Sequence, residues 1–211
     1  MTKLPERKLR VLLADDHMVV RMGIASVVAY AGGMEVVGEV DTGLDAVKLA
    51  HELKPDVVLM DLQMPEISGA EATAQIRAQD PGVKVLVLTS FGTSAELKKA
   101  MDAGASGALV KSSSLTEIVD AIRGVVEGKQ VMSPEIRNTI RSFAAMPALS
   151  KRQIDILNLV AKGLSNKEIA RIVGLSPDTV KYHVAKILQI IGSSTRAEAT
   201  SIAINLGLIT G

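Results

Sequence analysis

The sequence predicts an α/β protein in two parts: a doubly wound, five-stranded parallel sheet, and after it a small all-α domain. Between residues 9 and 127, short apolar runs rich in Val, Leu and Ile alternate five times with segments of helical periodicity. This alternation is typical of parallel strands joined by crossover helices. From residue 149 the pattern changes to short amphipathic segments separated by single glycines, which predicts several short helices.

The third strand is the clearest of the five and lies in the segment PDVVLMDLQMPEISG, residues 55–69. Residues 57–60 form a continuous apolar run between two prolines, as expected for a strand buried on both faces. Asp61 follows this run directly, and Gly69 opens the next helical pattern. Because open α/β sheets bind ligands beyond the carboxyl ends of their strands, Asp61 lies where a site is expected.

The other elements follow from the same periodicities. Gly104 lies where helix C-caps favour glycine, and Ser114 with Glu117 three residues later forms a capping-box pattern. We expect strands at residues 9–14, 34–40, 83–88 and 107–110, and helices at residues 17–30, 44–53, 69–78, 95–103 and 114–127.

Polar residues follow four of the strands and should meet at one edge of the sheet. Strand one is followed by Asp15 and Asp16, strand three by Asp61, strand four by Thr89 and strand five by Lys111. Three carboxylates repel one another and need a cation, and all-oxygen ligands suit Mg²⁺. A carboxylate, a metal ion, an ammonium and a hydroxyl around one point describe a phosphoryl-transfer site with Asp61 as the acceptor.

Histidine adds little to this prediction. His17, beside Asp16, could be a further ligand, but it more readily starts the first helix.

Composition limits the classes of protein that the chain can belong to. The 211 residues are 47% hydrophobic and contain no Cys, so a core is possible without disulfides, and thiolate chemistry is excluded. No segment resembles a signal peptide or a membrane span, so we expect a soluble, cytoplasmic protein. Residues 148–211 carry eight basic and four acidic residues, a net charge of +4, against −3 for the remainder. This asymmetry favours nucleic acid as a partner of the C-terminal part only.

Residues 129–147 are expected to link the two parts, because glycine and proline interrupt the periodicity, although residues 135–145 could form a short helix. The domains are therefore expected at residues 1–128 and 148–211. In the second, helices are expected from Ser150 to Gly163 and at residues 166–173, 178–191 and 195–206. LSNKEIARIVGLSPDTVKYHVAKIL, with a glycine turn between two short helices, predicts a helix-turn-helix whose second helix enters the major groove.

Residues 9–128 resemble the receiver domain of two-component response regulators, which has a flavodoxin-like fold. The resemblance is carried by Asp15-Asp16, by Asp61 in DLQMPEISG, by Thr89 in LTSF and by Lys111 after GASGALV. It implies that a sensor histidine kinase phosphorylates Asp61, and that Mg²⁺ is held by Asp15, Asp16, Asp61 and the backbone carbonyl of Gln63. It also implies that Lys111 pairs with the phosphate and that Thr89 turns towards it on activation.

One position departs from the receiver pattern. Receivers usually carry Tyr or Phe three residues before the lysine, and here that residue is Ala108. Phe91 is a possible substitute, although a partly buried packing role suits it better. The groups needed for phosphorylation are intact, and the route by which phosphorylation reaches the rest of the chain is left open.

Residues 148–211 resemble the LuxR-type DNA-binding domain of the NarL/FixJ regulators, through LSKRQIDILNLVAKGLSNKEIA, LSPDTVKYHVAKIL and TRAEA. On the recognition helix, Val180, Val184, Ile187 and Leu188 are expected to pack inward. Ala185 departs from an often basic family position, and Lys186 could compensate. Gln189 stands where lysine is common. The residues expected to contact DNA are Lys167, Arg171, Thr179, Lys181, Tyr182, Ala185 and Lys186.

Together these resemblances predict a transcription factor, without enzymatic activity of its own, whose DNA binding is controlled by phosphorylation of Asp61. Its expected partners are promoter half-sites, a sensor histidine kinase, RNA polymerase and a second copy of the chain, docked through Ile202, Ala203 and Leu206. Two alternatives remain open. An aspartate-nucleophile phosphatase would carry D-x-D, whereas Asp61-Leu62-Gln63 lacks the second acid. A DNA-binding protein whose receiver is only a dimerisation scaffold is favoured mildly by Ala108 and disfavoured by the acidic site.

Overall fold

The computed structural model describes residues 7–90, 94–145 and 149–209, which divide into two compact units. Of the described residues, 7–90 and 96–138 form the first unit, and 94–95, 139–145 and 149–209 form the second. Within the described residues, no helix combines the length and the apolar composition that a membrane span requires.

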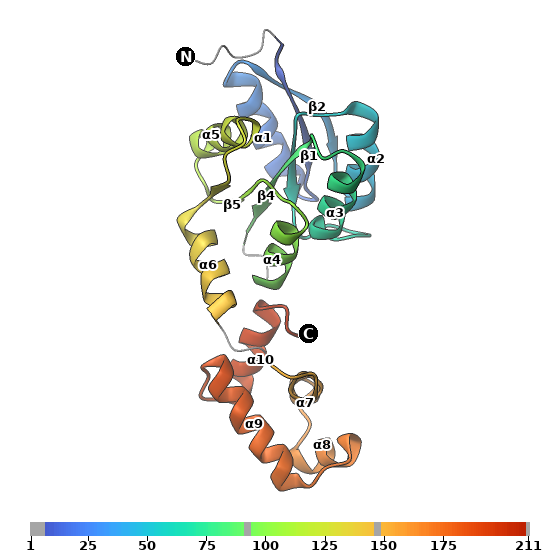
Figure 1. Cartoon of the computed structure of the whole chain (residues 1–211), viewed down its shortest axis with the longest axis vertical. Helices are drawn as coiled ribbons and strands as arrows, with labels where there is room; N and C mark the ends of the chain where they lie inside the picture. The colour runs from blue at the N-terminus through green and yellow to red at the C-terminus, as the bar shows by residue number, and fades with distance from the viewer. Residues whose placement is uncertain (1–6, 91–93, 146–148, 210–211) are drawn as a thin grey trace. The chain divides into compact units, whose positions relative to one another are not determined.

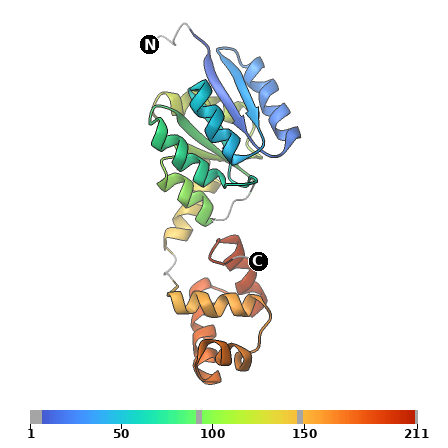
Figure 2. The ribbon, with the colours of Figure 1, turned by 90° about the vertical axis from the view of Figure 1, so that its right-hand side faces the viewer.

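The first unit is a parallel sheet between two layers of helices (Figures 1 and 2). Its strand order is β2-β1-β3-β4-β5-β6, and every neighbouring pair is parallel. The order reverses between β1 and β3, which makes their carboxyl ends the expected place for a site. The strands are β1 (Leu9–Ala14), β2 (Met34–Val40), β3 (Val57–Asp61), β4 (Lys84–Thr89), β5 (Gly107–Val110) and β6 (Val131–Met132).

Helices α1 and α5 cover one face of the sheet, and α2 and α3 cover the other. Their bounds are α1 (Met18–Tyr30), α2 (Gly43–Leu53), α3 (Gly69–Gln79), α4 (Ser94–Asp102) and α5 (Leu115–Val126). Strand β3 is buried throughout and alternates between the two cores: Val57 and Leu59 face the α1/α5 side, and Val58 and Met60 face the α2/α3 side. The prediction of a central strand buried on both faces is confirmed.

The sequence analysis expected five strands, but the sheet has six, because a further strand extends it beyond residue 128. Val131 and Met132 pair with Gly107 and Ala108, and the N–H of Ser133 donates to the carbonyl of Ala108 over 3.2 Å. A Cβ on Gly107 would lie 2.4 Å from the carbonyl oxygen of Val131, so this pairing requires a glycine. Helix α6 (Pro134–Ala145) begins directly after β6, with Ile136 buried.

The second unit contains helices α7 (Lys151–Ala161), α8 (Asn166–Val173), α9 (Pro177–Ile191) and α10 (Arg196–Asn205) around one apolar core. Ser150 and Ser165 cap α7 and α8 in capping boxes. Gly174 ends α8 in the left-handed conformation, with φ of 68°, and Ser176 caps α9. The predicted pair of short helices joined at a glycine turn is therefore present.

Candidate functional site

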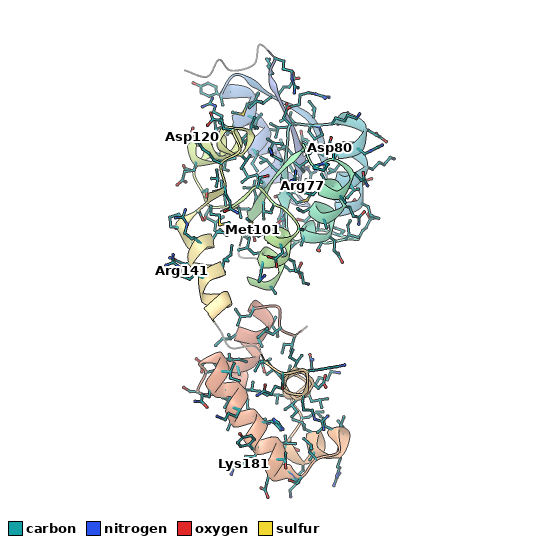
Figure 3. All side chains as sticks on the ribbon, in the orientation of Figure 1. Arg77, Asp80, Met101, Asp120, Arg141 and Lys181 are labelled. Atoms are coloured by element: carbon teal, nitrogen blue, oxygen red, sulfur yellow. The ribbon has the colours of Figure 1, made fainter. Side chains whose placement is uncertain are left out.

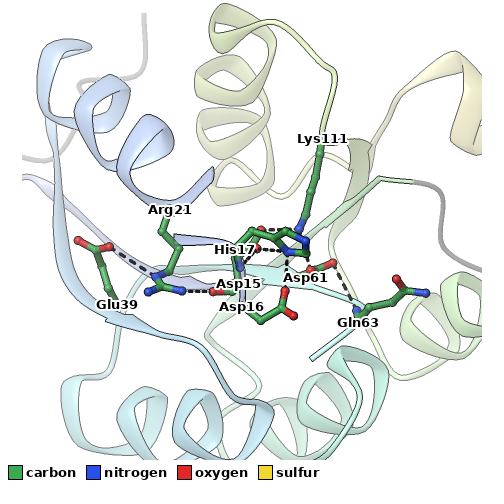
Figure 4. A network of polar contacts seen from close by, with 8 residues as sticks. All are labelled: Asp15, Asp16, His17, Arg21, Glu39, Asp61, Gln63 and Lys111. Atoms are coloured by element: carbon green, nitrogen blue, oxygen red, sulfur yellow. Dashed lines mark hydrogen bonds and ion pairs between the residues drawn. The ribbon is translucent and has the colours of Figure 1, made fainter. Parts of the chain in front are cut away.

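Acidic side chains converge at the carboxyl ends of β1 and β3 (Figure 4). Among the described residues, Asp15, Asp16, His17 and Asp61 each offer one ligand atom, and these atoms lie within 4.8 Å of one another. Asp15 and Asp61 are each only 4% exposed, whereas Asp16 and His17 are exposed to solvent. The expected meeting of three carboxylates at this edge of the sheet is what the structure shows.

Backbone hydrogen bonds hold the two buried carboxylates in place. The N–H of Asp15 donates to the carbonyl of Val40, and its Oδ1 accepts from the N–H of His17 at 2.8 Å. Oδ1 of Asp61 accepts from the N–H of Gln63 at 3.3 Å. Because these donors belong to the backbone, the directions of the carboxylates follow from the course of the chain at the two strand ends.

Lys111 enters the same cluster from the end of β5. Its Nζ lies 2.7 Å from Oδ2 of Asp15 and 2.7 Å from Oδ2 of Asp61, and its side chain is 9% exposed. One ammonium thus bridges two buried carboxylates, and it offsets part of their mutual repulsion.

The pKa values of Asp61 and Lys111 reflect this crowding. Burial raises the pKa of Asp61 above its ordinary 3.8, and the neighbouring Asp15 carboxylate adds to this, against the lowering by Lys111. Burial alone would lower the pKa of Lys111, but its hydrogen bonds to Asp15 and Asp61 carry that pKa above the ordinary 10.5. Lys111 therefore remains a cation at neutral pH, as a partner of phosphate must.

Thr89 completes the predicted set, as the buried last residue of β4. The N–H of Lys111 donates to the carbonyl of Thr89 over 2.7 Å, so these two residues are neighbours across the β4–β5 pair. Ala108 is fully buried between β4 and β6 and carries no ring. Phe91, considered as its substitute, lies outside the described residues.

The cluster suits a hard divalent cation. Asp15, Asp16 and Asp61 supply carboxylate oxygens, which Mg²⁺ prefers, and Gln63 is the residue two positions beyond the acceptor. His17 is the N-cap of α1, as expected, yet its Nδ1 also lies 2.6 Å from Oδ1 of Asp16. It is therefore within reach of an ion at this site as well.

Helices α8 and α9 of the second unit carry exposed basic side chains. The predicted inward residues Val180, Val184 and Ile187 are buried, and Leu188 packs against the core. Thr179 is half-buried, and its Oγ1 lies 2.8 Å from Oγ of Ser176 in the cap of α9. The exposed residues of the predicted set are Lys167, Arg171, Lys181, Tyr182, Ala185 and Lys186. Figure 3 shows Lys181 at the surface of this unit.

The residues predicted for dimerisation do not share one exposed face. Ala203 is 0% exposed and packs with Ala199 in the core of the second unit. Ile202 and Leu206 are half-buried. Ala203 therefore serves the packing of α10, and only its two neighbours are accessible.

Arg21 belongs to the acidic cluster, although the sequence analysis did not select it. Its Nη1 donates to the backbone carbonyl of Asp15, and its Nε lies 3.8 Å from Oε2 of Glu39. It is the one charged residue in α1, a helix of otherwise apolar and small residues. A lone arginine one turn beyond two aspartates was the signal that could have found it.

Known proteins share both units. The model of the response regulator receiver domain matches residues 11–123, and that of bacterial regulatory proteins of the luxR family matches residues 147–203. Response regulator protein VraR of Staphylococcus epidermidis is 41% identical over 206 residues, 95% of this chain and 99% of that protein. VraR of Staphylococcus aureus is 42% identical over the same shares.

Solved structures agree with these matches. The crystal structure of ChrA, the response regulator of a heme-sensing two-component system, is 35% identical with a TM-score of 0.59, and the match covers 96% of this chain and 99% of that one. RcsB of Salmonella typhimurium, at 23% identity, shares the fold with a TM-score of 0.77 over 92% of this chain and 98% of its own.

Fold and site define a two-component response regulator. More particularly, the chain belongs to the family in which a receiver domain is joined to a LuxR-type DNA-binding domain, and it is a transcription regulator.

Proposed function

We propose that a sensor histidine kinase phosphorylates Asp61 of this response regulator and that the phosphoryl group controls its binding to promoter DNA. The observation that carries the proposal is the convergence of Asp15, Asp61 and Lys111, in which one largely buried ammonium lies 2.7 Å from both carboxylates. We assign the receiver domain to residues 1–128, the linker to 129–147, of which Val131–Met132 join the receiver sheet as β6, and the DNA-binding domain to 148–211.

In the proposed reaction an Asp61 oxygen attacks the phosphorus of a phosphohistidine. The P–O bond to Asp61 forms as the P–N bond breaks, and the imidazole of the kinase leaves. Asp15, Asp16, Asp61 and the carbonyl of Gln63 would hold Mg²⁺, which neutralises charge on the phosphoryl oxygens when it is bound. Lys111 exchanges its contact with Asp61 for one with a phosphoryl oxygen, and Thr89 donates a hydrogen bond to another.

Incubation with acetyl phosphate and Mg²⁺ tests this assignment, with the mass of the intact chain as the readout. We expect one added phosphoryl group in the wild type and none in Asp61→Asn. Asp41→Asn is the matched control, because Asp41 is an exposed aspartate that follows β2 at the same edge of the sheet. An equal gain of mass in Asp61→Asn would exclude Asp61 as the acceptor.

We assign DNA recognition to α9 and phosphate contacts to Lys167 and Arg171 of α8. The support is the separation of α9 into a buried face and an exposed face that carries Lys181, Tyr182 and Lys186. Lys181→Ala is expected to weaken binding to a duplex selected in vitro with the wild-type chain by about 1–3 kcal/mol. Lys129→Ala in the first unit removes the same charge and is expected to leave binding unchanged. Equal affinities of Lys181→Ala and the wild type would contradict the assignment.

Control of DNA binding requires a change of state, and we propose that it is dimerisation on two half-sites in the cytoplasm, from which the dimer contacts RNA polymerase. The half-buried Ile202 and Leu206 remain candidates for the dimer contact, without Ala203. Light scattering before and after phosphorylation measures the mass. A phosphorylated chain that stays monomeric, also on DNA, would contradict dimer control. DNA binding that persists in a chain that accepts no phosphoryl group would favour the scaffold alternative.

A further inference from the structure

Arg21 is a largely buried cation whose contacts all lie beside the acidic cluster. Its side chain is 15% exposed, although it lies on the first turns of α1, where solvent is close. Burying a guanidinium is costly unless its donors are satisfied. Here Nη1 donates to the backbone carbonyl of Asp15, whereas the buried Nε has no hydrogen-bond partner among the described residues and is offset only by the Glu39 carboxylate, 3.8 Å away near the end of β2. Arg21 therefore joins β1, α1 and β2 at the edge that carries the site (Figure 4).

The carbonyl that Arg21 binds belongs to the peptide between Asp15 and Asp16. A hydrogen bond from a charged donor is stronger than one between neutral groups, so it fixes the plane of that peptide. The Asp15 carboxylate is already held by the N–H of His17 and by Lys111. Asp16 is exposed, and its contact with the exposed His17 ring is a weak restraint. The direction of Asp16 towards an ion thus depends strongly on the peptide that Arg21 holds.

The positive charge of Arg21 also supports a role in preparing the aspartates for a cation. Arg21 and Lys111 approach the aspartates from different elements, α1 and the end of β5 (Figure 4). Lys111 contacts the carboxylates of Asp15 and Asp61 directly, whereas Arg21 donates to the backbone carbonyl of Asp15 and occupies no carboxylate oxygen of Asp15 or Asp16. A cation held in this way reduces carboxylate repulsion without competing for a ligand atom.

We propose that Arg21 is a positioning residue of the phosphorylation site: by holding the Asp15–Asp16 peptide it directs the Asp16 carboxylate at the divalent cation, and Glu39 pairs with Arg21 in turn. The inference rests on the proposed binding of Mg²⁺ at this cluster. Groups behind metal ligands commonly contribute 10–100-fold to metal affinity.

The test is Mg²⁺ binding to the full chain by calorimetry, without a phosphoryl donor. Arg21→Gln is expected to weaken Mg²⁺ binding about tenfold, with Arg21→Lys and Glu39→Gln between it and the wild type. At low Mg²⁺, Arg21→Gln should be phosphorylated by acetyl phosphate more slowly than the wild type. At saturating Mg²⁺ its rate should recover to within about threefold of the wild-type rate. A purely structural role would not produce this split.

Arg77→Gln is the matched control. Arg77, in the last turn of α3, is also an arginine of the first unit that donates to backbone carbonyls, but its partners Pro81 and Val83 directly precede β4, at the amino ends of the strands and away from the site. We expect this variant to lower the melting temperature and leave Mg²⁺ affinity unchanged.

The outcomes separate the inference from the proposed function. Unchanged Mg²⁺ affinity in Arg21→Gln, or equal weakening in Arg77→Gln, overturns the positioning role. A wild-type chain that binds no Mg²⁺ overturns the proposed cation site itself. If Arg21→Gln fails to fold, Glu39→Gln decides: Mg²⁺ affinity equal to that of the wild type then overturns the inference.

Discussion

Replacing Gly69 with alanine is expected to damage the stability of the first unit and its phosphorylation site together. Gly69 is the first residue of α3, and a Cβ there would lie 1.9 Å from the carbonyl oxygen of Asp61 and 2.9 Å from Cα of Leu62. Cβ atoms keep at least 3.0 Å from such neighbours, so α3 and the end of β3 must separate by at least about 1.1 Å, the difference from 1.9 Å.

The free energy of unfolding should fall by about 2 kcal/mol. Both obstructing atoms belong to the backbone, so no rotamer change relieves the clash, and overpacking costs up to about 3 kcal/mol. The better helix propensity of alanine offsets about 1 kcal/mol of this. Displacement of the Asp61 backbone by about 1 Å should also slow phosphorylation by about 10–100-fold.

Scanning calorimetry measures the stability of each unit, because the transition that Mg²⁺ raises belongs to the unit that binds it. A loss of about 2 kcal/mol should lower its melting temperature by roughly 8 °C. Gly23→Ala is the matched control: Gly23 is exposed in α1, with nothing within 4 Å of the added Cβ, and alanine should stabilise the helix by about 0.5–1 kcal/mol. Unchanged stability and unchanged phosphorylation of Gly69→Ala would refute the steric argument.

Three further predictions concern stability. Hydrogen bonds from the backbone N–H groups of the N-cap serines lower the pKa values of Glu71 and Glu117 below the ordinary 4.5, so the stability that these glutamates contribute is complete at neutral pH and is lost as the pH falls below 4.5. Calorimetry across this pH range measures the loss of stability, and Glu117→Gln should lose less stability than the wild type as the pH falls. Gly107→Ala places a Cβ 2.4 Å from the carbonyl oxygen of Val131 and should speed hydrogen exchange of the Val131 amide about tenfold or more; equal exchange would contradict the need for glycine. Lys54 is the C-cap of α2 and has a φ of 47°, in the left-handed region. Lys54→Gly should raise the free energy of unfolding, measured in urea, by about 0.5–1 kcal/mol. A lower free energy of unfolding in this variant would show that the left-handed conformation of Lys54 carries no strain.

Most of the fold could be predicted because its signals are local. The five predicted strands lie within one residue of their expected bounds, since each is an apolar run long enough to stand out from its flanks. Strand β6 could not be predicted, because two residues cannot show an alternation. What permits β6 to pair is the glycine at position 107, distant in sequence.

The sequence predicts which residues form the site, but it does not predict the contacts that position them. Strand order alone brings Asp15, Asp61 and Lys111 to one edge, so their meeting followed from the topology. The lone arginine in an otherwise uncharged helix marks Arg21 as unusual, but its contact with the backbone carbonyl of Asp15 depends on the course of the β1–α1 turn, which the sequence pattern does not show. Ala203 was wrongly assigned to the exposed face of its helix, because alanine is common on both buried and exposed faces. In the structure its small side chain is packed in the core of the second unit.

Strand β6 fixes where the chain leaves the receiver sheet, and with it the start of α6 and the direction in which the side chains of α6 point. Its pairing with β5 ends where the N–H of Ser133 meets the carbonyl of Ala108, and Pro134 begins α6 at once. Successive helical residues differ by about 100° in direction, so one residue inserted between β6 and α6 would turn the side chains of α6 by more than a quarter of a revolution relative to β5. Chimeras that exchange receiver domains should therefore keep the interval from Lys111 to Pro134 constant, and a junction placed inside it changes the phase of α6 even when both parents fold.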